Sequence, residues 1–206
     1  MTLTHSWARP FEKSAAPKPA AEDVTSRWSK VSETPYDAYM KGVHETLSRL
    51  EKRKAGLEEI TKWMEIGYAF RYQSGNLYSP KLPARTESSR SGDCKDKALW
   101  LAEKLNDRSI RYVIGRIKRE TEENHAWLEW QGPNGRWILD CTKSAVPFLV
   151  DDRRSQQFVP LFSYTADGTY ANAAAITECT KLTRIAVRQH KGGSHRFREN
   201  PVASKR

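Results

Sequence analysis

Apolar side chains recur at steps of three and four residues along three stretches of the chain. This spacing places them on one face of a helix, and it predicts helices from Pro35 to about Arg53 and from Leu57 to about Tyr72. The third stripe, from Lys95 to Leu105, predicts a helix that begins beside Cys94 and is capped by Asp93. The first half of the chain is therefore expected to be helical.

Beyond residue 110 the hydrophobic period changes from 3.6 residues to 2, which is typical of β-strands. The turn signal GPNG at residues 132–135 predicts a hairpin between the second and third of these strands. Helices followed by antiparallel strands predict an α+β fold, with N-terminal helices packed on one face of an antiparallel β-sheet. The expected strands are residues 111–118, 125–131, 136–141, 158–164, a segment from 170 onward, and 181–187.

The length of 206 residues and the 38% hydrophobic content suit one domain. We expect it to span residues 23–187, between an Ala-, Pro- and Lys-rich leader at 1–22 and a disordered basic tail at 188–206. Residues 73–92 are rich in Ser, Pro, Gly and Arg, and they predict a long surface loop of the kind that often carries function.

The net charge of +10 raises the question of nucleic-acid binding. Residues 188–206 hold six Lys or Arg and one Glu, so about half of the excess positive charge lies in the predicted tail. This distribution favours a solvated tail and argues against nucleic acid as the partner, with docking on an acidic partner as the alternative.

No run of apolar residues is long enough to cross a bilayer, and residues 1–21 lack the apolar core of a secretory signal. We expect a monomer without a membrane span, cytoplasmic if the chain is complete and periplasmic if a signal peptide was removed. The three cysteines, Cys94, Cys141 and Cys179, include no CxxC pair, which argues against a structural zinc site and fits one reactive thiol.

Cys94 is the cysteine whose predicted surroundings favour the thiolate. A helix N-terminus presents the positive end of the helix dipole and unpaired backbone N–H groups, and the same N–H groups can donate to an oxyanion. A thiolate nucleophile also needs a partner that holds the ion pair and protonates the leaving group, and imidazole suits this role near neutral pH. Among the histidines, His125 opens a predicted strand.

The predicted hairpin places Asp140 relative to His125. If its loop holds an even number of residues, Asp140 falls on the face that carries His125, directly opposite or one diagonal step away. Asp140 could then orient the imidazole. An odd loop would separate the two.

Three segments, GDCKDKALWLAEKL, NHAWLEW and RWILDCT, resemble the Cys, His and Asp boxes of the transglutaminase-like, papain-related superfamily. The sequence is most similar to bacterial transglutaminase-like cysteine peptidases. These share a Trp segment before the first helix (here Arg27 and Trp28), a Pro-x-x-Thr loop before the Cys box (here Pro83 to Thr86), and a VPLFSYTADGTY-like hairpin after the Asp box.

The resemblance implies a papain-like fold and a catalytic triad of Cys94, His125 and Asp140. It also implies calcium as an optional cofactor, held by the Cys-box acids at Asp93 and Asp96, with no cofactor required for the chemistry. The family often has an acid where this chain has Lys95, which weakens the expectation of calcium.

The sequence therefore predicts a thiol protease acting on peptide or glutamine-type amide bonds of a protein or peptide substrate through a thioester. Alternatives are a crosslinking or deamidating enzyme of the same family and a non-catalytic binding module with a basic tail. Hydrolysis is favoured over crosslinking because water is always available as the acceptor. Besides the Cys94 N–H, Gln73 and Asn76 are candidate oxyanion donors in the predicted loop.

Overall fold

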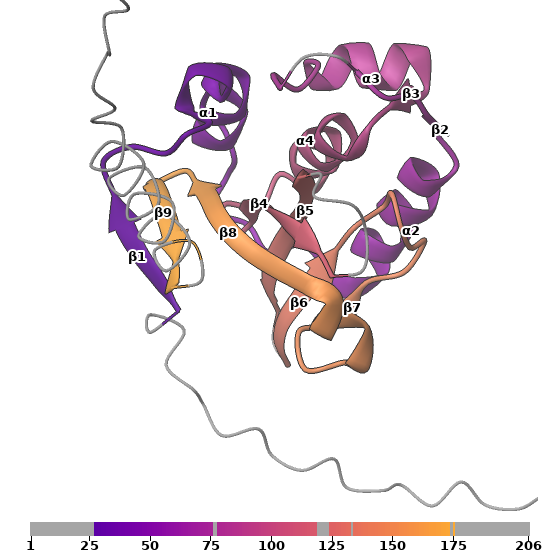
Figure 1. The fold of residues 1–206 in the computed structure, drawn as a ribbon. Coiled ribbons are helices and arrows are strands. Elements are labelled where there is room, and N and C mark those ends of the chain that lie inside the picture. Colours follow the sequence, from indigo (N-terminus) through magenta and orange to yellow (C-terminus); the bar gives the residue numbers. More distant parts are fainter. Residues whose placement is uncertain (1–26, 76–77, 119–123, 133, 174, 176–206) are drawn as a thin grey trace, which may run out of the picture.

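A computed structural model describes residues 27–75, 78–118, 124–132, 134–173 and 175 of the chain (Figure 1). They form a seven-stranded sheet in the order β1-β9-β8-β4-β5-β6-β7, in which every neighbouring pair is antiparallel. The strands are β1 (Trp28–Val31), β4 (Arg111–Ile117), β5 (Asn124–Gly132), β6 (Gly135–Leu139), β7 (Phe148–Leu149), β8 (Phe158–Thr165) and β9 (Gly168–Asn172).

Apart from one short 3-10 turn after β7, the helices with described bounds precede β4. They are η1 (Asp37–Tyr39), α1 (Lys41–Ser48), α2 (Leu57–Tyr68), α3 (Pro83–Ser89), α4 (Cys94–Leu105) and η2 (Arg153–Gln157). A small parallel pair, β2 (Arg71–Tyr72) and β3 (Ser91–Gly92), lies between them. The predicted α+β fold, with N-terminal helices packed on an antiparallel sheet, is confirmed.

The first helix is shorter than the periodicity predicted. Side chains take over the hydrogen bonds of the first turn: the Thr34 N–H donates to the Asp37 carboxylate at 3.0 Å, and the Thr34 hydroxyl is bonded to Tyr164. These contacts hold a turn and η1, so that the α-helix begins only at Lys41. At the other end it stops at Ser48, because Glu51 enters a β-bridge with Asp107.

The stretch predicted as one long loop also contains regular structure. Pro83 occupies the first turn of α3, where its missing N–H costs nothing, and Ser91 and Gly92 pair with β2. The loop prediction for residues 73–92 was wrong over α3 and β3, because elements this short show no readable hydrophobic period.

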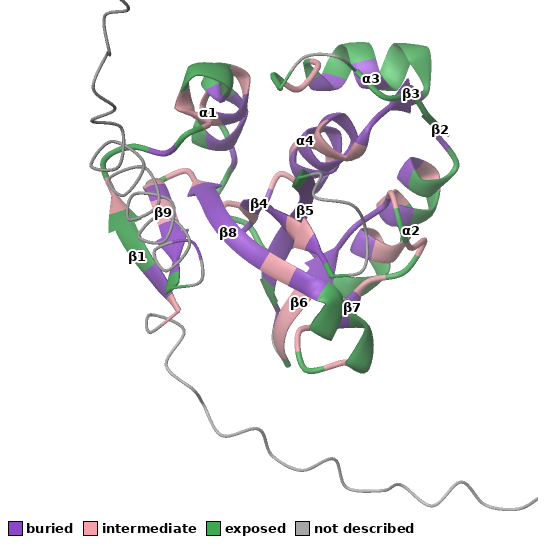
Figure 2. Cartoon of the chain, viewed as in Figure 1, coloured by how far each residue is buried: buried purple, intermediate pink, exposed green. Residues whose placement is uncertain are grey.

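The two larger hydrophobic clusters of the described residues lie on opposite faces of the sheet. On one face α1, α2 and α4 pack over Tyr112, Leu128 and Trp130. On the other face Val113, Trp127 and Ile138 pack with side chains that include Trp28, Phe148 and Phe158. Helix α4 and the central strands are buried along most of their length (Figure 2). Neighbouring residues of one strand enter different clusters, as strand geometry requires.

Several predictions fall outside the described residues: the leader, the strand at 181–187, the basic tail, Cys179 and Asn76. The domain bounds stay a prediction. Among the described residues no helix is both long and apolar enough to span a bilayer.

Candidate active site

Cys94 is the first residue of α4, as the capping pattern predicted. The Asp93 carboxylate accepts the Asp96 N–H, and the Asp96 carboxylate accepts the Asp93 N–H, both at 3.3 Å. This reciprocal capping box fixes the direction in which the helix begins. The backbone N–H of Cys94 has no acceptor within its own helix, as is general for a first turn.

The β5–β6 hairpin brings His125 and Asp140 together. Its register pairs Leu128 with Leu139 and Gly132 with Gly135, so the turn is even, and one further step sets Asp140 opposite Trp127. His125 is then the diagonal neighbour of Asp140. Its Nε2 lies 2.7 Å from Asp140 Oδ2.

Asp140 is held by the chain that follows it. Its second oxygen, Oδ1, accepts the backbone N–H groups of Thr142 at 2.9 Å and Lys143 at 3.3 Å. The carboxylate is buried and both of its oxygens are engaged. Rotation of the side chain would break these bonds, and Asp140 therefore fixes the orientation of the imidazole.

Aromatic rings surround His125 on the side away from α4. The Trp127 ring stacks on the imidazole with ring centroids 6.0 Å apart, and the Phe158 centroid lies 6.3 Å away. Gly115 pairs with His125 across β4 and β5 and leaves room for Trp127: a Cβ there would lie 2.5 Å from the Trp127 ring and 2.2 Å from the Val159 oxygen. The bond between His125 and Asp140 lies in buried surroundings, since the two residues are 8% and 1% exposed.

The imidazole of His125 is tuned towards its charged form. Burial lowers its pKa, but hydrogen bonding to Asp140 and to Cys94, together with the charges of both, outweighs burial and raises the pKa from 6.5 to about 10. Since Asp140 occupies Nε2, Nδ1 is the ring nitrogen left for the thiol. The arrangement favours the imidazolium form of His125 beside Cys94.

Lys97 is a buried cation that sequence reasoning missed. Its side chain is 2% exposed, and Nζ donates to the Phe70 carbonyl oxygen at 2.7 Å. Burial lowers its pKa, and this outweighs the nearby charge of Asp140, which raises it. The signal was present, because Lys97 precedes Leu101 by one helical turn and so lies on the buried face of α4.

Cys141 differs from Cys94 in accessibility and in chemistry. It is buried against Gly67 and Trp100, whereas Cys94 is partly exposed. Burial, followed by the charge of Asp140, raises the pKa of the Cys141 thiol to about 12. At neutral pH Cys141 is therefore a protonated thiol of the core.

Of the two candidate oxyanion donors in the loop, only Gln73 is described. Its backbone N–H donates to the Gly92 oxygen at 3.1 Å, and its Oε1 accepts the Ser91 hydroxyl at 3.1 Å. These bonds hold Gln73 beside β3, the strand that directly precedes Asp93 and Cys94 in the sequence. Its role as a donor stays a prediction.

The pair expected to hold calcium, Asp93 and Asp96, does not fit that ion. Calcium takes about six to eight oxygen ligands, mostly from carboxylates and carbonyls. Here all four carboxylate oxygens already accept backbone N–H groups, and the ammonium of Lys95 contacts Asp93 Oδ2. Among the described residues no three His, Cys, Asp or Glu side chains gather as a metal site would require.

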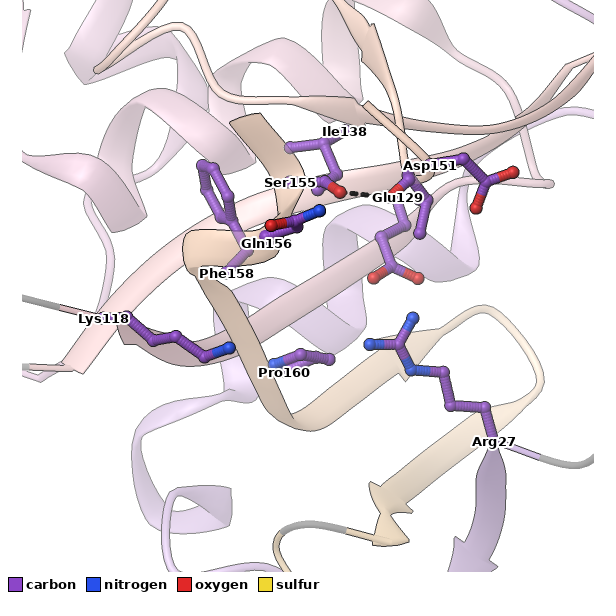
Figure 3. A pocket seen from close by; sticks show the side chains of 10 residues that line it. Arg27, Lys118, Glu129, Ile138, Asp151, Ser155, Gln156, Phe158 and Pro160 are labelled. Carbon is purple, nitrogen blue, oxygen red and sulfur yellow. Dashed lines mark hydrogen bonds between the residues drawn. The ribbon is translucent and has the colours of Figure 1, made fainter. Parts of the chain in front are cut away.

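A cavity of about 410 Å³ lies on the face of the sheet opposite the helices (Figure 3). Glu129 points into it towards Arg27, and Phe158, which also contacts the His125 ring, forms part of its wall. Burial raises the pKa of Glu129 against the lowering effect of Arg136, Arg27 and Arg111. Neither Cys94, His125 nor Asp140 lines this cavity.

Comparison with known proteins gives structural neighbours only. No protein-family model and no curated protein sequence matches the chain. The calcium-bound structure of LapG from Legionella pneumophila is 18% identical, with a TM-score of 0.48, over 62% of this chain and 74% of LapG. The EGTA-treated form of LapG gives the same identity and TM-score.

A candidate cysteine protease from Cytophaga hutchinsonii is 20% identical, with a TM-score of 0.41, over 66% of this chain and 45% of that protein. At such identities the activity has to be inferred from the residues of this chain.

Proposed function

We propose that the protein is a cysteine peptidase that hydrolyses peptide or glutamine-type amide bonds through a thioester on Cys94. The observation that carries the proposal is the 2.7 Å bond between His125 and Asp140 beside a thiol at the start of α4. The three side chains come from a helix, a strand and the residue after a strand, and they suit the roles of nucleophile, acid–base and orienting group.

In the first half of the reaction the Cys94 thiolate attacks the amide carbonyl carbon. A C–S bond forms, and the negative oxygen that develops accepts hydrogen bonds from N–H groups at the start of α4. The C–N bond then breaks, and the His125 imidazolium donates its proton to the departing nitrogen. The products are a thioester on Cys94 and a free amine or ammonia.

In the second half, neutral His125 takes a proton from water, and the resulting hydroxide attacks the thioester carbonyl carbon. The C–S bond breaks, a carboxylic acid leaves, and Cys94 and His125 return to the ion pair. Asp140 accepts the Nε2–H of the imidazole throughout and holds the ring in one orientation. An amine in place of water would give crosslinking by the same steps.

The first experiment compares two cysteine variants. Cys94→Ala should abolish cleavage of a fluorescent casein substrate, and Cys141→Ala should retain cleavage because the Cys141 thiol is protonated and buried. A Cys94→Ala protein that cleaves casein as fast as wild type would disprove the proposal. A casein that wild type itself does not cleave calls for the thiol measurement below.

Reactivity of the thiols tests the site without a substrate. At pH 7 iodoacetamide should alkylate Cys94 at least about 100-fold faster than Cys141, as read by peptide mass spectrometry. His125→Ala should remove most of that advantage, since the imidazolium that stabilises the thiolate is gone. Equal alkylation rates of Cys94 and Cys141 would contradict the proposal and favour a binding module that lacks catalysis.

A further inference from the structure

We infer that the ammonium group of Lys95, aided by Lys81, takes the place of a divalent cation at the start of α4, so that this site is ordered without calcium. The acids Asp93 and Asp96 are compensated by side chains of the chain itself. Ordering of this site by ammonium groups does not depend on whether the protein is a peptidase.

Asp93 joins Lys95 to the segment that precedes α3. Its Oδ2 atom contacts the Lys95 ammonium and accepts the Gly75 N–H at 3.2 Å. The Lys95 side chain is only 17% exposed, and its Nζ would lie 3.6 Å from a Cβ built on Gly75. One carboxylate thus connects the helix start, the loop backbone and a largely enclosed positive charge.

Asp96 makes the corresponding connection to Lys81. Its Oδ1 accepts the Lys81 N–H at 2.7 Å, and the Lys81 ammonium lies 3.6 Å from Oδ2 and 3.5 Å from the Ser91 oxygen. Asp93 and Asp96 lie on either side of Cys94 in the sequence. Through them the helix start is bonded to the described parts of the loop, residues 73–75 and 78–82. Calcium can hold a loop in this way where several carboxylates lie close together.

The charges around this place leave little attraction for a metal ion. Two carboxylates face two ammonium groups and the positive end of the α4 dipole. A divalent ion would have to displace the Lys95 ammonium and the backbone N–H donors from the two carboxylates. Among the described residues no further acid gathers there to serve as an additional ligand. An acid at position 95 would reverse this balance, because three carboxylates would then face the Lys81 ammonium alone.

The test uses the full-length protein, with melting temperature and calorimetry as readouts. The melting temperature of wild type should be the same in 1 mM EGTA and in excess calcium, and calorimetry should detect no binding of calcium. Lys95→Met should lower the melting temperature by roughly 4 to 8 °C, since it leaves a buried carboxylate without its cation. Lys41→Met, in a side chain that is 88% exposed, is the matched control and should change it by less than about 2 °C.

The Lys95→Glu variant tests the converse, that an acid at position 95 makes the site depend on calcium. This variant should be less stable than wild type in EGTA, should recover on addition of calcium, and should show heat of calcium binding. A wild-type protein that loses stability in EGTA or binds calcium would overturn the inference. A Lys95→Met protein no less stable than the Lys41→Met control, or a Lys95→Glu protein indifferent to calcium, would also overturn it.

Discussion

The β5–β6 hairpin carries two pairs of an acidic and a basic residue that are diagonal neighbours in the register. One pair is hydrogen-bonded and the other is not. His125 and Asp140 form one pair, and Glu129 and Arg136, four residues further along each strand towards the turn, form the other. The first pair is bonded at 2.7 Å. In the second, Glu129 Oε2 and Arg136 Nε are 3.8 Å apart, and both are buried without a hydrogen-bond partner among the described residues.

The difference shows that register brings side chains near one another and their surroundings decide whether they bond. Asp140 is short, and two backbone N–H groups hold it. His125 is rigid and stacked on Trp127. Glu129 and Arg136 stand on longer, flexible stems, and Arg27 and Arg111 compete for the same carboxylate. The candidate site is therefore preorganised in a way that the Glu129 cavity is not.

The largest expected effect comes from making the same change in both pairs. Asp140→Asn should lower kcat/KM by roughly 100-fold or more, because the amide no longer fixes and stabilises the imidazolium. Glu129→Gln, an equally conservative change of a buried acid on the same strand pair, should alter kcat/KM by less than about 3-fold. Steady-state kinetics on a peptide substrate measures both, and similar losses in the two variants would remove the distinction between the pairs.

A second prediction concerns the alkaline limit of activity. His125 with its pKa of about 10 should keep the imidazolium over the neutral range, and kcat/KM should fall only as the pH approaches that value. In Asp140→Asn the fall should begin nearer pH 6.5. The rate of iodoacetamide alkylation of Cys94 against pH gives an independent reading, and an unchanged profile in Asp140→Asn would deny Asp140 this role.

The raised pKa of His125 also predicts how the stability of the folded protein depends on pH. The raised pKa of His125 means that its protonation stabilises the folded protein fully below about pH 6.5, and this contribution is lost as pH rises through about 10. Wild type should therefore lose its stability advantage over Asp140→Asn between those values in denaturant titrations.

A smaller effect is expected from Lys97, whose positive charge lies near Asp140. Lys97→Met leaves the Phe70 oxygen without this donor and removes the cation, and it should lower kcat/KM by roughly 10-fold and reduce the melting temperature. Lys104→Met, on the same helix but paired with Glu87 at the surface, is the control. Equal effects of the two substitutions would show that Lys97 is an ordinary helix residue.

The smallest effect belongs to Glu129. Because burial raises its pKa, ionisation of Glu129 costs stability as the pH rises above about 4.5 through its folded value. The melting temperature of wild type relative to Glu129→Gln should thus decline by about 2 to 4 °C between pH 4 and pH 7. A difference that grows in favour of wild type would show that the arginines outweigh burial.

The sequence predicted what is local or periodic. The helix beginning at Cys94, its Asp93 cap and the even β5–β6 turn follow from spacing, and these features bring His125 to Asp140. Strand β7 and helix α3 were missed, because two and seven residues are too few to display a period. Sequence spacing also cannot weigh desolvation, which depends on the packed core. For that reason the cavity at Glu129 emerged only from the structure, whereas the position of Lys97 one turn before Leu101 already indicated its burial.

The two ends of α4 are both tied to other parts of the fold. At the far end Arg53 donates to the Leu105 oxygen at 3.1 Å, and the buried Asp107 accepts Ala55 N–H and Trp130 Nε1–H, each at 2.9 Å. Because α4 is held at both ends and is buried along most of its length, it cannot shift or tilt independently of the rest of the fold. The backbone that carries Cys94 is consequently held in place, and any rearrangement at the candidate site has to come from the segments around it.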